Sequence, residues 1–126
     1  MSEELNIDKR IEEIDISIEA QKTMVTRAEA LERLLTNDDF KLVMIDGYLD
    51  IEANRVFNLL TSPRVTKSEE TASYLSQLDT IKDIARYLGD GDYPGTVAIQ
   101  GANAKKAIDE MVAMKQELLA SVKKES

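Results

Sequence analysis

Residues 3–36 read EELNIDKRIEEIDISIEAQKTMVTRAEALERLLT and contain neither proline nor glycine, the two residues that most often interrupt a helix. Apolar residues recur in this stretch at steps of three and four, the spacing of one face of an α-helix. We therefore predict a helix over 3–36, whose 34 residues extend about 50 Å at 1.5 Å per residue. The face, called the apolar stripe below, consists of Ile7, Ile11, Ile14, Ile18, Val25 and Ala28, with Gln21 in its one polar position.

The apolar stripe needs a partner, because one exposed helix cannot bury an apolar face alone. Its repeat of about 3.5 residues predicts supercoiling with another helix, and the continuation through Leu31 and Leu35 changes that register. The last predicted helix, 96–124, has a similar length and a matching set of apolar residues. The sequence therefore predicts that the two terminal helices pair antiparallel as a coiled-coil stalk, from which part of the first helix projects.

Between the terminal helices we expect three shorter helices that form a small head. Asn37 and Asp38 are good N-cap residues for a helix that ends near Gly47. A third helix is expected over 48–60, before Ser62-Pro63, and a fourth from an N-cap at Thr66 or Ser68 to residue 88. The fold class is thus all-α with about five helices. The expected layout is a single domain over 1–126, with stalk helices 1–36 and 96–124 and a head and loop over 37–95.

Composition excludes several kinds of chemistry. The chain has no cysteine and no histidine, which removes disulfides, thiolate catalysis and the commonest general base and transition-metal ligand. Its N-terminal segment is acidic rather than an apolar signal, and its longest apolar run, residues 42–45, is too short to span a bilayer. We therefore expect synthesis in the cytosol and no membrane partner.

Net charge is −8, and residues 1–20 carry two basic against seven acidic side chains. This acidity argues against direct binding to a nucleic-acid backbone. Two interpretations stay open. The more frequent meaning is a solvated helix face that keeps the protein soluble, and the other is a DNA mimic that occupies a basic groove on a host protein.

The loop over residues 89–95 fits neither a calcium loop nor a phosphate-binding loop. Tyr93 and Pro94 stand where an EF-hand continues its ligands, and neither the GxGxxG spacing nor a following lysine is present. Carboxylate pairs at helical spacing lie on expected exposed faces without the aromatics that line a sugar cleft. We predict a plain interhelical loop, no catalytic, cofactor-binding or metal-ligating residue, and no enzymatic activity.

Three basic residues, Arg55, Arg64 and Lys67, cluster around the Ser62-Pro63 turn. Solvated charges at a loop are the more frequent meaning of such a cluster. An acidic partner or a nucleic-acid backbone is the alternative.

Residues 31–60 read LERLLTNDDFKLVMIDGYLDIEANRVFNLL and resemble a family of small helical proteins encoded among the head and tail morphogenesis genes of tailed bacteriophages. The family pattern joins an LL-x-N-x-D-F-K segment to G-Y-L-x-x-E-A-x-R. The resemblance implies a phage protein of similar size and helical layout, and it carries no catalytic motif. The matching residues are Leu34, Leu35, Asn37, Asp39, Phe40, Lys41, Gly47, Tyr48, Leu49, Glu52, Ala53 and Arg55, followed by Leu78, Ile81, Ile84, Tyr87 and Leu88.

The resulting hypothesis is a non-enzymatic component of virion assembly, of structural, scaffolding or chaperone type, that binds phage structural proteins. The alternative is an acidic inhibitor of a host enzyme, such as RNA polymerase or a defence nuclease. Expected locations are the host cytoplasm during assembly and the virion, and self-association is a further expectation. The candidate protein-interaction residues are Ile7, Ile11, Ile14, Ile18, Phe40, Tyr48 and Arg55.

We predict that replacing Ile11, Ile14 and Ile18 with serine lowers the assembled mass or the helicity, because the stripe loses its apolar contacts. Light scattering and circular dichroism measure the two quantities. If neither changes, the stripe is not an interface.

Overall fold

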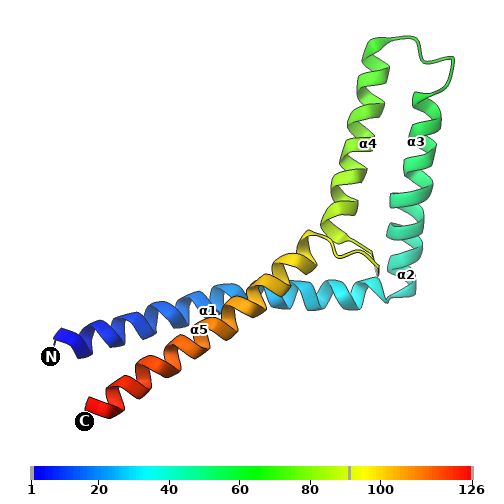
Figure 1. The fold of residues 1–126 in the computed structure, drawn as a ribbon. Coiled ribbons are helices and arrows are strands. Elements are labelled where there is room, and N and C mark those ends of the chain that lie inside the picture. The colour runs from blue at the N-terminus through cyan, green and yellow to red at the C-terminus, as the bar shows by residue number, and fades with distance from the viewer. Residues whose placement is uncertain (1, 91, 126) are drawn as a thin grey trace. The chain divides into compact units, whose positions relative to one another are not determined.

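The protein is all-α in a computed structural model that describes residues 2–90 and 92–125 (Figure 1). No β-strand is found in these two ranges, and Gly89 and Pro94 form an isolated antiparallel bridge. The elements are α1 (Ser2–Leu35), α2 (Asp38–Phe40), the π-helix η1 (Lys41–Glu52), α3 (Ala53–Leu60), α4 (Ser68–Leu88) and α5 (Thr96–Glu125).

The predicted count of five helices is wrong, because the expected break at Gly47 does not occur. α2, η1 and α3 follow one another without interruption, so the described residues form four continuous helical segments. A glycine inside a helix costs only about 1 kcal/mol relative to alanine and does not block the backbone as proline does. Asn37 does cap this segment, since its side chain accepts the Phe40 backbone N–H at 2.9 Å. The expected cap of α4 is also wrong, because Lys67 holds that position without a side-chain hydrogen bond.

The chain divides into two compact units, which are described separately. Unit 1 consists of Met1–Glu29 and Ile99–Ser126, and unit 2 consists of Ala30–Ala98. The predicted single domain with a stalk and a head stays a prediction.

In unit 1, small residues allow α5 to lie close to α1. A Cβ atom added at Gly101 would lie only 2.3 Å from the Cβ of Ala28, so the two backbones approach more closely than two alanines allow. Ala104, one turn further along α5, is 1% exposed. A second contact joins Lys115 Nζ to Asp15 Oδ1 at 2.8 Å. Gly101 of α5 thus lies against Ala28 of α1, and Lys115, further along α5, contacts Asp15, nearer the start of α1. A coiled coil over the full length of the two helices stays a prediction.

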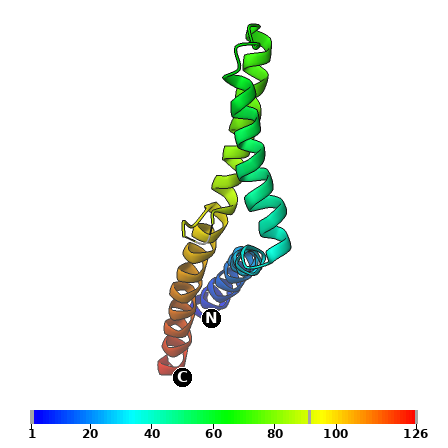
Figure 2. The ribbon, with the colours of Figure 1, turned by 90° about the vertical axis from the view of Figure 1, so that its right-hand side faces the viewer.

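In unit 2, α4 packs against η1 and α3 (Figures 1 and 2). Val56 of α3 and Ile81 of α4 are 1% and 5% exposed, and the core of this unit also includes Leu31 and Val97. The helices of this pair are therefore held by few but well-buried aliphatic side chains.

The π-helix has a physical reason in the spacing of the sequence. Residues spaced four apart do not stay on one side of an α-helix. A step of four residues turns about 40° more than one full turn of 3.6 residues, so such a series drifts around the helix axis. A π-helix, closed by i→i+5 hydrogen bonds, holds more than four residues per turn, so the same step falls short. Because the drift in the π-helix η1 is opposite to the drift in the α-helix α3, the two largely cancel. One series of residues spaced four apart, called the inner series below, therefore stays on the side of this segment that packs against the rest of unit 2. All members of that series are half-buried or buried: Phe40, Met44, Tyr48, Glu52, Val56 and Leu60.

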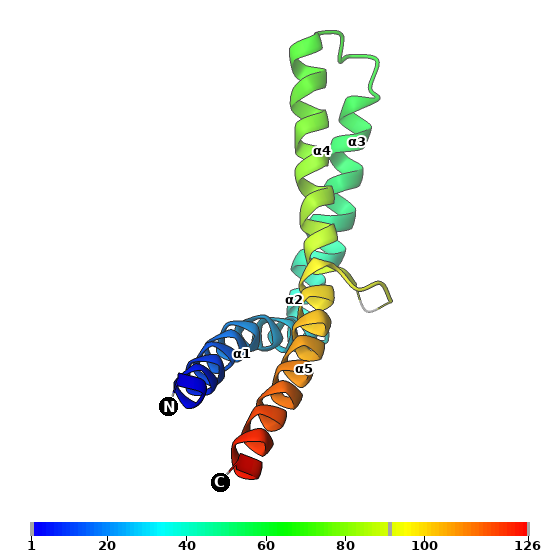
Figure 3. The same cartoon turned by 60° about the vertical axis from the view of Figure 1, so that its left-hand side comes forward.

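Figure 3 shows the loop between α4 and α5. Gly89, Gly95 and Asp90 hold its two sides together. Gly89 has φ 66°, which glycine adopts without strain, and a Cβ at Gly95 would lie 2.4 Å from the Gly89 nitrogen. Asp90 Oδ1 accepts the backbone N–H groups of Asp92 and Tyr93 at 2.7 and 2.6 Å. The side chain of Asp90 therefore supports the turn itself.

We predict that Gly101→Ala destabilises the protein by about 1–2 kcal/mol, because the added methyl overlaps Ala28 and this overpacking outweighs the gain in helix propensity. Urea unfolding followed by circular dichroism measures the loss. The double variant Ala28→Gly/Gly101→Ala moves the methyl to the other helix and should recover most of it. Failure of the second substitution to restore stability would contradict the close approach.

Candidate interaction surfaces

The core is sparse in both units. Among the described residues, seven apolar side chains are buried and no polar side chain is. Large apolar side chains are exposed on most helices, from Leu5 of α1 to Leu119 of α5. Surfaces that expose grouped apolar side chains are typical of interaction sites, so the groups on these helices are the candidate functional surfaces.

The apolar stripe packs largely inside unit 1. Ile14 and Ile18 are 9% and 8% exposed, and Ile7 and Ile11 are half-buried. Ile14 and Ile18 are therefore covered by other residues of the same chain. The prediction that these four isoleucines contact another protein stays a prediction.

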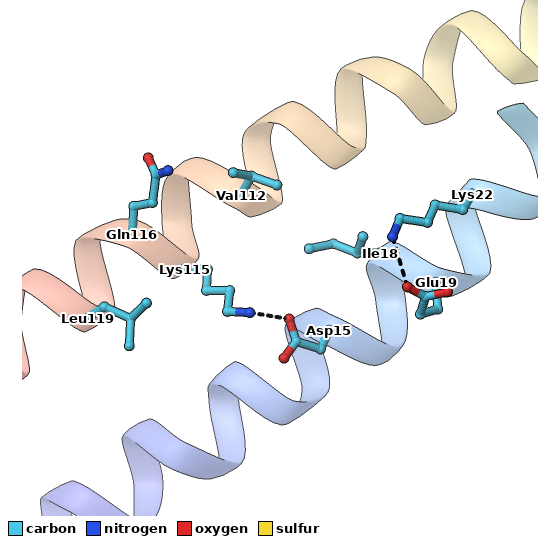
Figure 4. A pocket seen from close by; sticks show the side chains of 8 residues that line it. All are labelled: Asp15, Ile18, Glu19, Lys22, Val112, Lys115, Gln116 and Leu119. Atoms are coloured by element: carbon cyan, nitrogen blue, oxygen red, sulfur yellow. Dashed lines mark hydrogen bonds and ion pairs between the residues drawn. The ribbon is translucent and has the colours of Figure 1, made fainter.

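A groove runs between α1 and α5 beside the stripe (Figure 4). It has a volume of about 690 Å³, and Val112 and Leu119 along it are 39% and 47% exposed. The Lys115–Asp15 ion pair crosses the groove, and Lys22 Nζ binds Glu19 Oε1 at 2.9 Å on the α1 side. We call this surface the α1/α5 groove; its lining residues are Asp15, Ile18, Glu19, Lys22, Val112, Lys115, Gln116 and Leu119.

The other three candidate residues lie in unit 2. Phe40 and Tyr48 are half-buried members of the inner series of α2 and η1, so packing accounts for much of their apolar surface. Arg55 is exposed, and its Nε donates to Glu52 Oε2 at 2.9 Å. This hydrogen bond, aided by the charge of Arg55, lowers the pKa of Glu52 below its ordinary value. Arg55 is thus paired one turn away on its own helix, and its predicted contact with another protein stays a prediction.

Sequence reasoning missed an exposed group on η1. Leu42, Val43 and Ile51 are 66%, 64% and 67% exposed, and we call them the η1 apolar strip. Val43, Gly47 and Ile51 follow one another at the same interval of four as the inner series, on another side of the π-helix. The run Leu42-Val43-Met44-Ile45 was the available signal, because four consecutive apolar residues cannot all face inward on one helix.

Other kinds of site are absent from the part of the chain that the structure describes. Within residues 2–90 and 92–125, no cluster of three or more carboxylates could hold a metal ion. In the same ranges no helix is long and apolar enough to cross a membrane. No family profile, curated protein or solved structure matches the chain.

We predict that Arg55→Gln raises the pKa of the Glu52 carboxyl toward its ordinary value, because the hydrogen bond that favours the carboxylate is lost. Since the folded pKa of Glu52 is lowered, the pair stabilises the protein above the unfolded-state pKa, and this contribution disappears as pH falls through the folded value. A carbon-13 NMR titration of Glu52 measures both midpoints, with Lys67→Gln as the control. Equal midpoints in the parent protein and Arg55→Gln would refute the pairing.

Proposed function

We propose that the chain is a non-enzymatic protein-binding component, and that its η1 apolar strip contacts a partner protein. The observation that carries this proposal is the exposure of Leu42, Val43 and Ile51, each about two thirds open to water. Burying such side chains contributes roughly 1.5–3 kcal/mol each, which is the usual driving force of a protein–protein contact. The helix that carries the strip, η1, packs against α4.

The phage assignment rests on the sequence resemblance over residues 31–60, which includes the η1 apolar strip. We propose that the partner is a structural protein of a tailed phage and that the chain acts during assembly in the host cytoplasm or within the virion. We also propose that α1 and α5 pair as an antiparallel coiled-coil stalk. The contacts Gly101–Ala28 and Lys115–Asp15 support that pairing at two levels of unit 1.

A second candidate function is an acidic inhibitor of a basic host enzyme. Four carboxylates, Asp8, Glu12, Asp15 and Glu19, follow one another at steps of four and three on one side of α1, and Ile16 beside them is 64% exposed. Asp15 and Glu19 already pair with Lys115 and Lys22. Asp8 and Glu12 are like charges four residues apart, which destabilise a helix by roughly 0.2–0.5 kcal/mol, so a basic partner would relieve that repulsion. Binding of this kind should weaken strongly as salt rises.

The proposal predicts that purified particles or assembly intermediates of the encoding phage contain the chain in a fixed ratio to a structural protein. Quantitative mass spectrometry measures that ratio. Val43→Asp/Ile51→Asp should remove the chain from particles at unchanged expression, whereas Leu75→Asp, at a 48% exposed position in α4, should not. Absence of the parent chain from both fractions, with salt-sensitive capture of a host polymerase or nuclease, would favour the inhibitor instead.

A further inference from the structure

The α1/α5 groove leaves branched apolar side chains open between two helices. Ile18 closes the base of the groove at 8% exposure, while Val112 and Leu119 keep 39% and 47% of their surface in water. A pair of helices has no third layer to cover such a groove, and packing against a second pair is the usual solution in helix bundles. We propose that this groove binds the same groove of a second copy of the chain, so that two copies of unit 1 form an antiparallel four-helix bundle.

The exposed area of the chain is large enough for such an interface. The chain exposes 9451 Å², whereas two compact globules with the masses of the two units would together expose roughly 8,100 Å². The surplus, on the order of 1,300 Å², exceeds the roughly 800 Å² that each partner buries in a standard interface. The surplus belongs to the whole chain and includes the η1 apolar strip of unit 2 as well as the groove of unit 1.

Charge selects the arrangement of the two copies. Residues 1–29 carry four basic and eight acidic side chains, whereas residues 99–126 carry five basic and four acidic ones. Placing α1 on α1 of the second copy would therefore bring two acidic helices together, which is unfavourable. Placing α1 on α5 of the second copy joins an acidic helix to a slightly basic one. A two-fold axis parallel to the helices produces this second arrangement.

The Lys115–Asp15 pair has a definite role in the bundle. Both side chains are partly exposed now, at 34% and 49%, and they would be more deeply covered by the second copy. Burying an ion pair adds little net affinity, but displacing it from its partner is costly. The pair therefore fixes the register of the bundle, as a single polar layer does in coiled coils.

The other edge of unit 1 offers less to a second copy. Its hollow is lined by Arg10, Glu13, Ile14, Ser17, Met111 and Met114. Three of its four α1 residues are polar, and the exposed apolar side chain is the flexible Met114, at 43%. This edge supplies a matched control position. The inference concerns unit 1 alone and does not rest on the function proposed for the η1 apolar strip.

Sedimentation equilibrium of the full chain tests the proposal. We expect a species of twice the 14.1 kDa chain mass at micromolar concentration. Leu119→Glu should raise the dimer dissociation constant at least about tenfold, whereas Met114→Glu, similarly exposed on the other edge, should leave it unchanged. Circular dichroism verifies that both variants stay helical. A parent chain that is monomeric throughout, or a dimer that Met114→Glu disrupts as strongly as Leu119→Glu, overturns the proposal.

Cross-linking tests the arrangement separately and uses the absence of cysteine from the chain. The Lys115–Asp15 and Gly101–Ala28 contacts put Gln116 level with residues 13–14 of α1. Glu12 of the second copy should therefore lie beside Gln116. A short bismaleimide should link an equimolar mixture of Glu12→Cys and Gln116→Cys chains into heterodimers. Efficient linking of Glu12→Cys to itself, or no linking in the mixture, contradicts the arrangement.

Discussion

The close approach of Gly101 to Ala28 is the constraint on which unit 1 depends. Because the glycine lacks a side chain where the Ala28 methyl lies, α5 can pack against α1 with Ala104 fully covered one turn away. That contact sets which residues stand level along the two helices. This register places Lys115 beside Asp15. It also places Val112 and Leu119 along the groove between the two helices.

Periodicity predicted the long helices well, because their ends coincide with strong local signals. The predicted 3–36 and 96–124 compare with Ser2–Leu35 and Thr96–Glu125, and Asn37 and Ser62-Pro63 lie at helix boundaries as expected. Gly47 misled the prediction, since a glycine's preference for helix ends is weaker than the packing of the inner series that includes Tyr48 and Val56. The π-helix could not be predicted from the apolar spacing, because that spacing was compared with the α-helical period of 3.6 residues per turn.

The candidate surfaces could be predicted only in part. The stripe was visible because it lies on one helix, and its burial at Ile14 and Ile18 agrees with a need for a partner helix. The α1/α5 groove depends on the register between α1 and α5, which brings together residues as far apart in sequence as Asp15 and Lys115, 100 positions from each other. No periodicity within one helix contains that register. The η1 apolar strip was missed for a related reason. Whether Val43 and Ile51 share a side depends on the turn size of the helix that carries them.

Both units thus share one property: their helices bury few side chains and leave large apolar side chains exposed. In the proposed dimer, a second copy completes the core of unit 1. Thermal unfolding of the parent chain over a hundredfold range of concentration tests it most directly. If dimerisation stabilises the folded state, Tm rises with concentration by mass action. A Tm that does not change across that range would show that the chain completes its fold alone and would contradict the proposed dimer.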